Sequence, residues 1–175
     1  MGEEKNNPFP VLKTERLILR QLENNDANEI YALRSNDQVN KYLERKPSES
    51  IDDAKVFIQA IHKNIQNNHS FYWAINLNGS DKLVGTICLF DFSADNLKAE
   101  IGYELLPDFQ GKGIMQEAFA KVIDFGIQDL RLDSIEATTH RENKKSIALL
   151  EKFNFKNKIN IGSNFTKYAL QIKKE

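Results

Sequence analysis

The sequence has little of what marks several protein classes. Its one cysteine, Cys88, cannot form a disulfide within the chain, which suits a reducing compartment. No apolar run approaches the roughly 18 residues of a membrane span, and residues 1–13 lack the apolar core of a signal peptide. We therefore expect a cytoplasmic protein without a membrane partner.

An excess of charge of one sign is also absent. The 24 lysines and arginines nearly balance the 25 aspartates and glutamates, which leaves a net charge of −1. Such a chain has no global attraction for nucleic acid. We expect no nucleic-acid partner and no metal cofactor, and the composition leaves a homodimer open.

The rest of the composition is that of an ordinary globular protein. Hydrophobic residues make up 41% and charged residues 28% of the 175 residues, enough for one domain with a substantial core. No repeat, low-complexity segment or linker interrupts the chain. The predicted organisation is a loose polar lead-in at 1–13 and a single domain at 14–175.

Apolar periodicity predicts both helices and strands. Asp26 followed by Glu29 predicts a helix start of the capping-box type with aspartate as the cap, and Ser50 followed by Asp53 predicts another such start. The order indicates antiparallel hairpins followed by a strand–helix–strand crossover. Strands are predicted near 16–22, 71–77, 82–92, 98–106, 134–139, 155–161 and 165–172, and helices near 24–35, 36–47, 51–67, 114–130 and 143–153.

The segment Gln110-Gly111-Lys112-Gly113-Ile114-Met115 joins a predicted strand to the longest apolar helix stripe. Glycine carries no Cβ, so this glycine pair lets the backbone approach a ligand closely. The free N–H groups of the first helical turn, with the positive end of the helix dipole behind them, favour phosphate. The segment is therefore a candidate phosphate-binding loop.

Two common phosphate-binding motifs do not fit this loop. A P-loop requires glycine at 106 and serine or threonine at 113, where the sequence has Leu106 and Gly113. A dinucleotide fingerprint starting at Gly111 requires glycine or alanine at 116, which is Gln116. A plain strand-to-helix turn uses glycines in the same way, so the loop alone leaves ligand binding open.

Segments around this loop resemble the GNAT superfamily of N-acetyltransferases, and within it the RimJ- and RimL-like ribosomal-protein N-terminal acetyltransferases. They are Ile101–Leu105 before Gln110–Gly113, Asn143–Ser146 before Leu149–Phe155, and the opening strand Thr14–Arg20. The resemblance implies the GNAT fold, an α/β (α+β mixed sheet) architecture with flanking helices. In that fold the sheet is mostly antiparallel, and one strand bulges and splays from the next to form a slot.

The resemblance also implies acetyl-CoA as co-substrate. The loop would hold the pyrophosphate, and the strand edge at Leu105–Leu106 would hydrogen-bond the pantetheine as an added strand does. Met115 departs from the family pattern, which has glycine or alanine at that position. The implied cofactor-binding residues are Leu105, Leu106, Gln110, Gly111, Lys112, Gly113, Ile114, Met115, Asn143 and Ser146. Lys112, Lys144 and Lys145 are candidates for the 3′-phosphate.

Acetyl transfer to an amine requires a base, an acid for the departing thiolate, and a donor to the oxyanion. Strand alternation places Glu100 and Glu104 on one face, and we expect Glu100 to be the base, with Glu104 second and His140 third. The base would be a carboxylate among apolar neighbours, where the pKa of such a group rises. The resemblance implies a backbone N–H near Leu105 or Leu106 as the oxyanion donor.

For the acid, the resemblance suggests Ser146, and Tyr168 in the last strand is its rival. Both Ser146 and Asn143 also have a purely structural interpretation at the start of a helix, where asparagine is a preferred N-cap. An N-cap can nevertheless turn its amide toward the pantetheine, so the two roles of Asn143 are compatible.

The acceptor has no readable motif. The resemblance favours a peptide or protein α-amine, while a polyamine, an amino acid or an antibiotic amine stays open. A different class, a non-catalytic acyl-CoA sensor, is distinguished only by the lack of a base and an acid at the thioester. Candidate acceptor contacts are Glu29, Asp37, Glu44 and Trp73.

Overall fold

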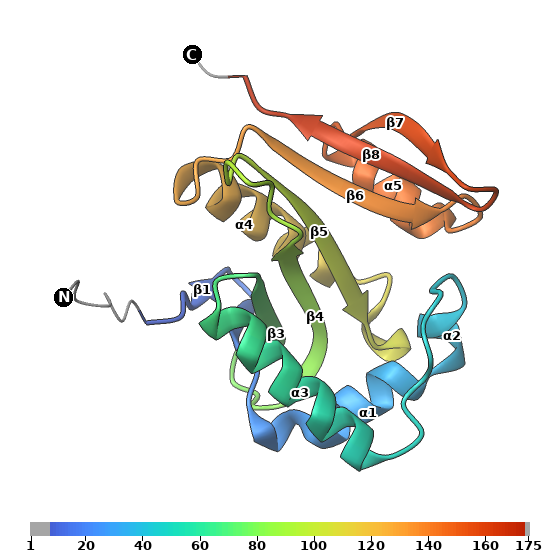
Figure 1. Ribbon diagram of the computed structural model, residues 1–175. Coiled ribbons are helices and arrows are strands. Elements are labelled where there is room, and N and C mark those ends of the chain that lie inside the picture. The colour runs from blue at the N-terminus through green and yellow to red at the C-terminus, as the bar shows by residue number, and fades with distance from the viewer. Residues whose placement is uncertain (1–7, 174–175) are drawn as a thin grey trace.

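A computed structural model describes residues 8–173. Within that range one eight-stranded sheet runs in the order β1-β2-β3-β4-β5-β6-β8-β7, and β5–β6 is its parallel pair (Figure 1). The strands are β1 Leu12–Lys13, β2 Leu17–Gln21, β3 Phe71–Leu77, β4 Leu83–Phe90, β5 Lys98–Leu105, β6 Ser134–His140, β7 Lys156–Ile161 and β8 Phe165–Gln171. The helices are α1 Ala27–Ser35, α2 Asp37–Asn40, α3 Ile51–Gln66, α4 Ile114–Gln128 and α5 Lys144–Lys152, with 3-10 turns η1 Asn24–Asp26 and η2 Pro107–Phe109. The predicted mixed, mostly antiparallel sheet with flanking helices is confirmed.

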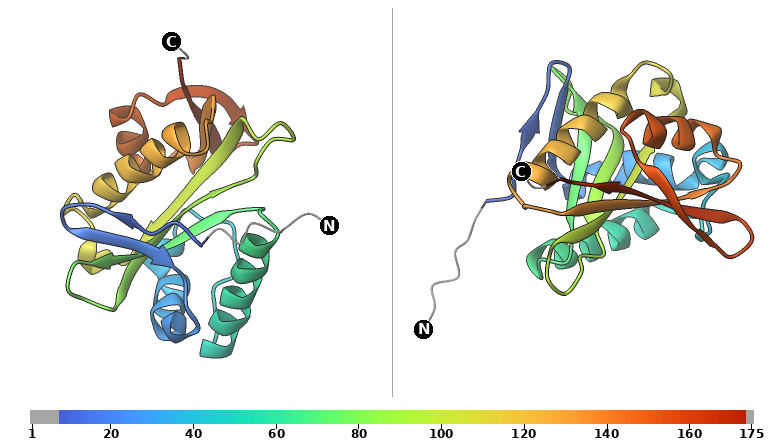
Figure 2. Two further views of the ribbon diagram at one scale, coloured as in Figure 1. Left: turned by 90° about the vertical axis from the view of Figure 1, so that its left-hand side faces the viewer. Right: turned by 90° about the horizontal axis from the view of Figure 1, so that it is seen from above.

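Each face of the sheet has its own apolar core, because successive strand side chains point to opposite faces. On β3, Trp73 and Ile75 belong to the core that α4 and α5 cover, whereas Tyr72 and Ala74 pack toward α1 and α3. Figure 2 shows α4 and α3 on opposite sides of the strands.

The two predicted capping boxes differ in outcome. At α3, Ser50 accepts a hydrogen bond from the Asp53 N–H and the box is complete, as predicted. At α1 the predicted Asp26–Glu29 box is wrong. The Asp26 carboxylate instead accepts from the Glu23 N–H and pairs with Arg20, which anchors η1 to β2.

The β5–β6 pair closes only at one end. Pairing joins Lys98–Glu100 to Ser134–Glu136, and beyond Glu100 the strands diverge (Figure 1). The pairing of β5 with β4 is regular from Glu100 to Leu105, so the expected bulge is absent while the expected splay is present. The backbone of β5 beyond Glu100 is thereby exposed to a slot between the two strands.

The predicted lead-in is partly structured. Leu12–Lys13 form β1, and Phe9 packs against the core, while residues 1–7 lie outside the described range. Among the described residues, no helix has the length and apolarity needed to cross a membrane. The same residues contain no group of three His, Cys, Asp or Glu side chains arranged to hold a metal ion.

Candidate active site

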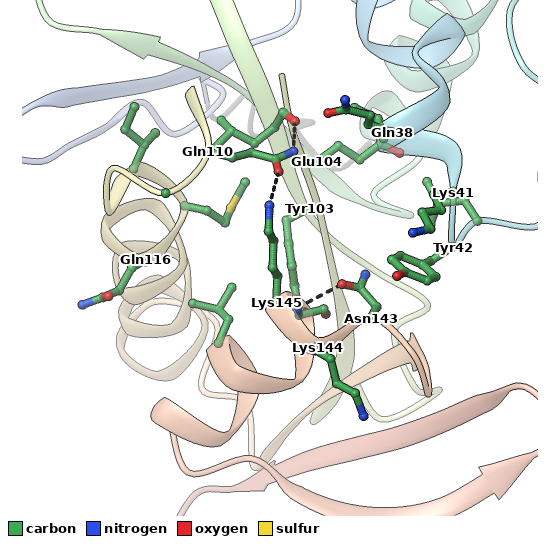
Figure 3. A pocket seen from close by; sticks show the side chains of 18 of the residues that line it. Gln38, Lys41, Tyr42, Tyr103, Glu104, Gln110, Gln116, Asn143, Lys144 and Lys145 are labelled. Atoms are coloured by element: carbon green, nitrogen blue, oxygen red, sulfur yellow. Dashed lines mark hydrogen bonds between the residues drawn. The ribbon is translucent and has the colours of Figure 1, made fainter. Parts of the chain in front are cut away.

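A cavity of about 620 Å³ lies beside the open end of β5, bordered by the α2 region, the loop before α4 and the start of α5. Figure 3 shows Gln38, Lys41 and Tyr42 across the cavity from Gln110. The cavity therefore joins the loop before α4 to the α2 region. Its lining in the described chain is Gln38, Val39, Lys41, Tyr42, Leu43, Tyr103, Glu104, Leu105, Gln110, Gly111, Gly113, Ile114, Met115, Gln116, Glu142, Asn143, Lys144, Lys145, Ser146 and Leu149.

The glycine loop forms one end of the cavity. Gly111 has φ +75° and Gly113 has φ +76°, a left-handed conformation that side chains with a Cβ rarely adopt. Gly113 is the N-cap of α4, so the first-turn N–H groups of Ile114 and Met115 have no partner within the helix. The loop thus presents donors and the positive helix end to a cavity that Ile114 and Met115 both line.

The edge of β5 faces the cavity at Leu105. The Gln110 side chain donates from Nε2 to the Leu105 carbonyl at 2.9 Å, and Lys145 Nζ donates to Gln110 Oε1 at 3.2 Å (Figure 3). The next residue, Leu106, points its N–H the other way and donates to Val84 of β4 at 2.9 Å. Because alternate residues of a strand direct their backbone groups to opposite sides, the Leu105 N–H shares the cavity side with its carbonyl.

The start of α5 forms the wall opposite β5. Asn143 caps the helix by accepting from the Ser146 N–H at 3.2 Å, as predicted. Ser146 Oγ lies 2.6 Å from the Tyr103 hydroxyl, and either oxygen can donate. Burial raises the pKa of Tyr103 to about 12, so its hydroxyl keeps its proton at neutral pH.

Glu104 lines the cavity from the opposite face of β5. Its carboxylate pairs with Arg45, from the segment after α2, and both side chains are mostly buried. Glu104 Oε2, Arg45 Nη2 and the nearby Arg34 Nε are buried and have no hydrogen-bond partner among residues 8–173. Buried polar atoms of this kind require water or a ligand as partners.

Comparison with known proteins decides the family. An acetyltransferase (GNAT) domain model matches residues 16–156. The chain belongs to the GNAT family. It is an acetyl-CoA-dependent N-acetyltransferase.

Individual GNAT relatives agree with this assignment. The uncharacterized N-acetyltransferase YoaA of Bacillus subtilis is 37% identical over 84% of this chain and 83% of its own. A spermidine N(1)-acetyltransferase of Vibrio cholerae is 26% identical over 80% of this chain and 79% of its own. The structure of RimL, a ribosomal L7/L12 alpha-N-protein acetyltransferase, has a TM-score of 0.83 over 93% of this chain and 94% of its own. At 16% identity, RimL shows the GNAT fold alone.

Most of the predicted GNAT cofactor residues meet at the cavity. Leu106 and Lys112 lie outside its lining. The Leu106 N–H donates to Val84 of β4, and the Lys112 carbonyl accepts from Arg16. The sequence does not single out Tyr103, because strand alternation places it on the apolar face of β5, where an aromatic side chain resembles core. Leu105, Gln110, Gly111, Gly113, Ile114, Met115, Asn143, Ser146, Lys144 and Lys145 all contribute to the lining.

Only some of the residues predicted to catalyse the transfer lie at the cavity. Glu104 and Ser146 line the cavity, whereas Glu100 does not. Glu100 lies at the closed end of the β5–β6 pair, 3.6 Å from Lys167 Nζ, so it has an ion-pair partner in place of the expected apolar neighbours. Tyr168 is 7% exposed and packs in the core covered by α4, outside the lining.

His140 and the four predicted acceptor contacts also lie outside the lining. His140 packs between Tyr42 and Phe165, with ring centroids 5.4 and 5.3 Å away. Trp73 is fully buried and donates to the Pro10 carbonyl, so it is a core residue. Residues around α2 take the place of the predicted contacts, and the lining does not include Glu29, Asp37 or Glu44.

Proposed function

We propose that this GNAT enzyme acetylates the α-amine of a peptide or protein N-terminus, as a member of the RimJ- and RimL-like group. The observation that carries the proposal is the charge at the α2 end of the cavity. There Glu104 is paired with Arg45, and Lys41 is the other charged lining residue from the α2 region and β5. A peptide N-terminus brings one cation followed by neutral amides, which suits such a site.

A polyamine acceptor would require a site with a net negative charge. Spermidine is a polycation, and its recognition requires several carboxylates that are not already paired. The cavity lining contains two carboxylates, Glu104 and Glu142, against Lys41, Lys144 and Lys145. The balance of charge therefore favours a peptide over the acceptor named for the spermidine-acetylating relative.

Acetyl-CoA would lie along the loop and the open edge of β5. The N–H groups of Gly113, Ile114 and Met115 would hold the pyrophosphate at the helix N-terminus. The pantetheine amides would pair with Leu105, as an added strand does. Lys144 and Lys145, at the first turn of α5, are the cations placed to meet further phosphate oxygens.

The acetyl transfer would use both faces of β5. The neutral amine attacks the thioester carbon, and the resulting oxyanion accepts from the Leu105 N–H, which faces the cavity. Glu104 takes the proton of the attacking amine, directly or through water. The proposal thus moves the base from Glu100 to Glu104, because only Glu104 lines the cavity.

Collapse of the tetrahedral intermediate breaks the carbon–sulfur bond and leaves the thiolate of CoA. Ser146 would donate its proton to that sulfur. The Tyr103 hydroxyl, 2.6 Å from Ser146 Oγ, then returns a proton to the serine and regains one from solvent. Asn143 fixes the position of Ser146 by capping α5.

A panel of amines tests the acceptor. Thiol release from acetyl-CoA is measured with short peptides that have free N-termini, the same peptides with blocked N-termini, spermidine, and free amino acids. We expect turnover with the free peptides and a kcat/KM at least about tenfold lower with spermidine. A preference for spermidine, or equal turnover of the blocked peptides, would overturn the proposed acceptor.

A further inference from the structure

The described residues hold a polar cluster on the outer side of the glycine loop that the chemistry above does not use. Arg16, just before β2, donates from Nη1 to the Lys112 carbonyl at 2.9 Å and from Nε to Glu117 Oε2 at 2.6 Å. Its backbone N–H donates to Glu117 Oε1 at 2.8 Å, and Thr14 Oγ1 donates to the same oxygen at 2.5 Å. These four hydrogen bonds join the start of β2 to the loop and the first turn of α4.

These contacts fix the orientation of one peptide group in the loop. In a trans peptide, the carbonyl oxygen and the following N–H point in opposite directions. Because Arg16 holds the Lys112 carbonyl, the Gly113 N–H must point away from Arg16. Gly113 lines the main cavity on one side and a smaller cavity with Arg16 and Glu117 on the other. We infer that the N–H points toward the main cavity, because the lining of that cavity includes Gly113 and not Arg16.

Glycine alone does not enforce this orientation. Glycine can adopt a left-handed φ in other loop conformations as well. A flip of the peptide between Lys112 and Gly113 would turn the Lys112 carbonyl into the cavity. A carbonyl there would repel a phosphate that an N–H would attract. Glu117 holds the guanidinium of Arg16 through Nε, which leaves Nη1 directed at the loop.

We propose that Arg16 is a positioning residue for acetyl-CoA, which holds the Gly113 N–H toward the pyrophosphate without touching the cofactor. The inference rests on the placement of the pyrophosphate in the proposed function. It assigns Thr14 and Glu117 a supporting role, because they orient the guanidinium.

Calorimetric titration of the full chain tests this role with two ligands, CoA and dephospho-CoA, which share the pyrophosphate and differ in the 3′-phosphate. For Arg16→Ala we expect the Kd of both ligands to rise about tenfold, because the variant loses one charge-assisted hydrogen bond. The KM for acetyl-CoA should rise by the same factor, with kcat within about twofold of the wild type. Arg131→Ala, which removes an exposed arginine beyond the far end of α4, is the matched control and should change neither.

Three results would overturn the role of Arg16. The first is an unchanged Kd for both ligands, and the second is a fall in kcat alone. The third is a weaker affinity for CoA but not for dephospho-CoA, which would mean that Arg16 contacts the 3′-phosphate directly. If Arg16→Ala does not fold, Arg16→Lys decides, because lysine keeps the charge but cannot hold Lys112 and Glu117 in one fork. Wild-type affinities in Arg16→Lys would also overturn it. A wild type that binds neither ligand would instead refute the placement of the pyrophosphate itself.

Discussion

The two ends of β5 are built from the same alternating pattern and do different things. At the closed end, Glu100 lies beside paired β6 and forms an ion pair with Lys167, which also bonds Glu136. At the open end, Glu104 projects from the same face of β5, but β6 has diverged and a cavity lies beside it. The surroundings of a carboxylate on this strand thus depend on where the neighbouring strand separates. Glu100 pairs with Lys167, whereas Glu104 pairs with Arg45 and lines the cavity.

Exchanging the two carboxylates for amides gives the largest expected contrast. Glu104→Gln should lower kcat by about 100-fold at neutral pH, because an amide cannot accept the proton of the amine. Glu100→Gln should leave kcat within about twofold, since its side chain lies outside the cavity. Both are measured by thiol release with a peptide acceptor, and melting curves check that each variant is folded. An equal loss of kcat in the two variants would contradict different roles for Glu100 and Glu104.

A smaller contrast is expected between two sets of hydroxyl groups. Ser146→Ala should lower kcat about tenfold and Tyr103→Phe somewhat less, because the thiolate then relies on water for its proton. Tyr168→Phe is the matched control, since Tyr168 lies in the core, and it should leave kcat unchanged. The same thiol assay at saturating acetyl-CoA separates these outcomes. An unaffected Ser146→Ala enzyme would show that the acid lies elsewhere.

The smallest effect concerns stability at the closed end. The pKa of Glu136 is lowered, first by the hydrogen bond from Lys158 and then by that from Lys167. A lowered folded pKa stabilises the protein above the unfolded value of about 4.3, and this contribution is lost as pH falls through the folded pKa. Lys158→Met should therefore cost less than about 1 kcal/mol in urea unfolding at pH 7, and this cost should shrink as the pH falls through the folded pKa of Glu136. Its kcat should not change, and a cost independent of pH would contradict the ion-pair explanation.

Local signals predict most elements, because their causes lie within a few residues. The Ser50–Asp53 box and the Asn143 cap need no distant partner, and the two glycines mark the loop by themselves, although Arg16 holds the Lys112 carbonyl from 96 residues away. The predicted Asp26 box is wrong because Arg20, on the preceding strand, binds the carboxylate that would cap the helix. Periodicity reveals which side chains share a face, and it does not reveal what a distant strand places beside them.

The site is predictable from the sequence only as far as the loop and the start of α5. Alternation places Glu100 and Glu104 on one face and cannot rank them, since the ranking depends on where β6 stops pairing. Arg45 is 59 residues from Glu104 in the sequence, so no local pattern indicates the pair. Tyr103 resembles core in the sequence, and Trp73 resembles a site residue, because aromatic side chains serve both purposes.

The hydrogen bond from Gln110 to the Leu105 carbonyl has a consequence for the protein without its cofactor. A strand whose backbone groups lack partners is a template for any extended chain, including another copy of the same protein. The amide of Gln110, itself held by Lys145, covers that position on the open edge of β5. In the proposed binding mode, an incoming pantetheine amide would take the place of the Gln110 amide at the Leu105 carbonyl. Binding of such a ligand would exchange one hydrogen bond for another. A ligand without an amide at that point would leave Gln110 bound to Leu105.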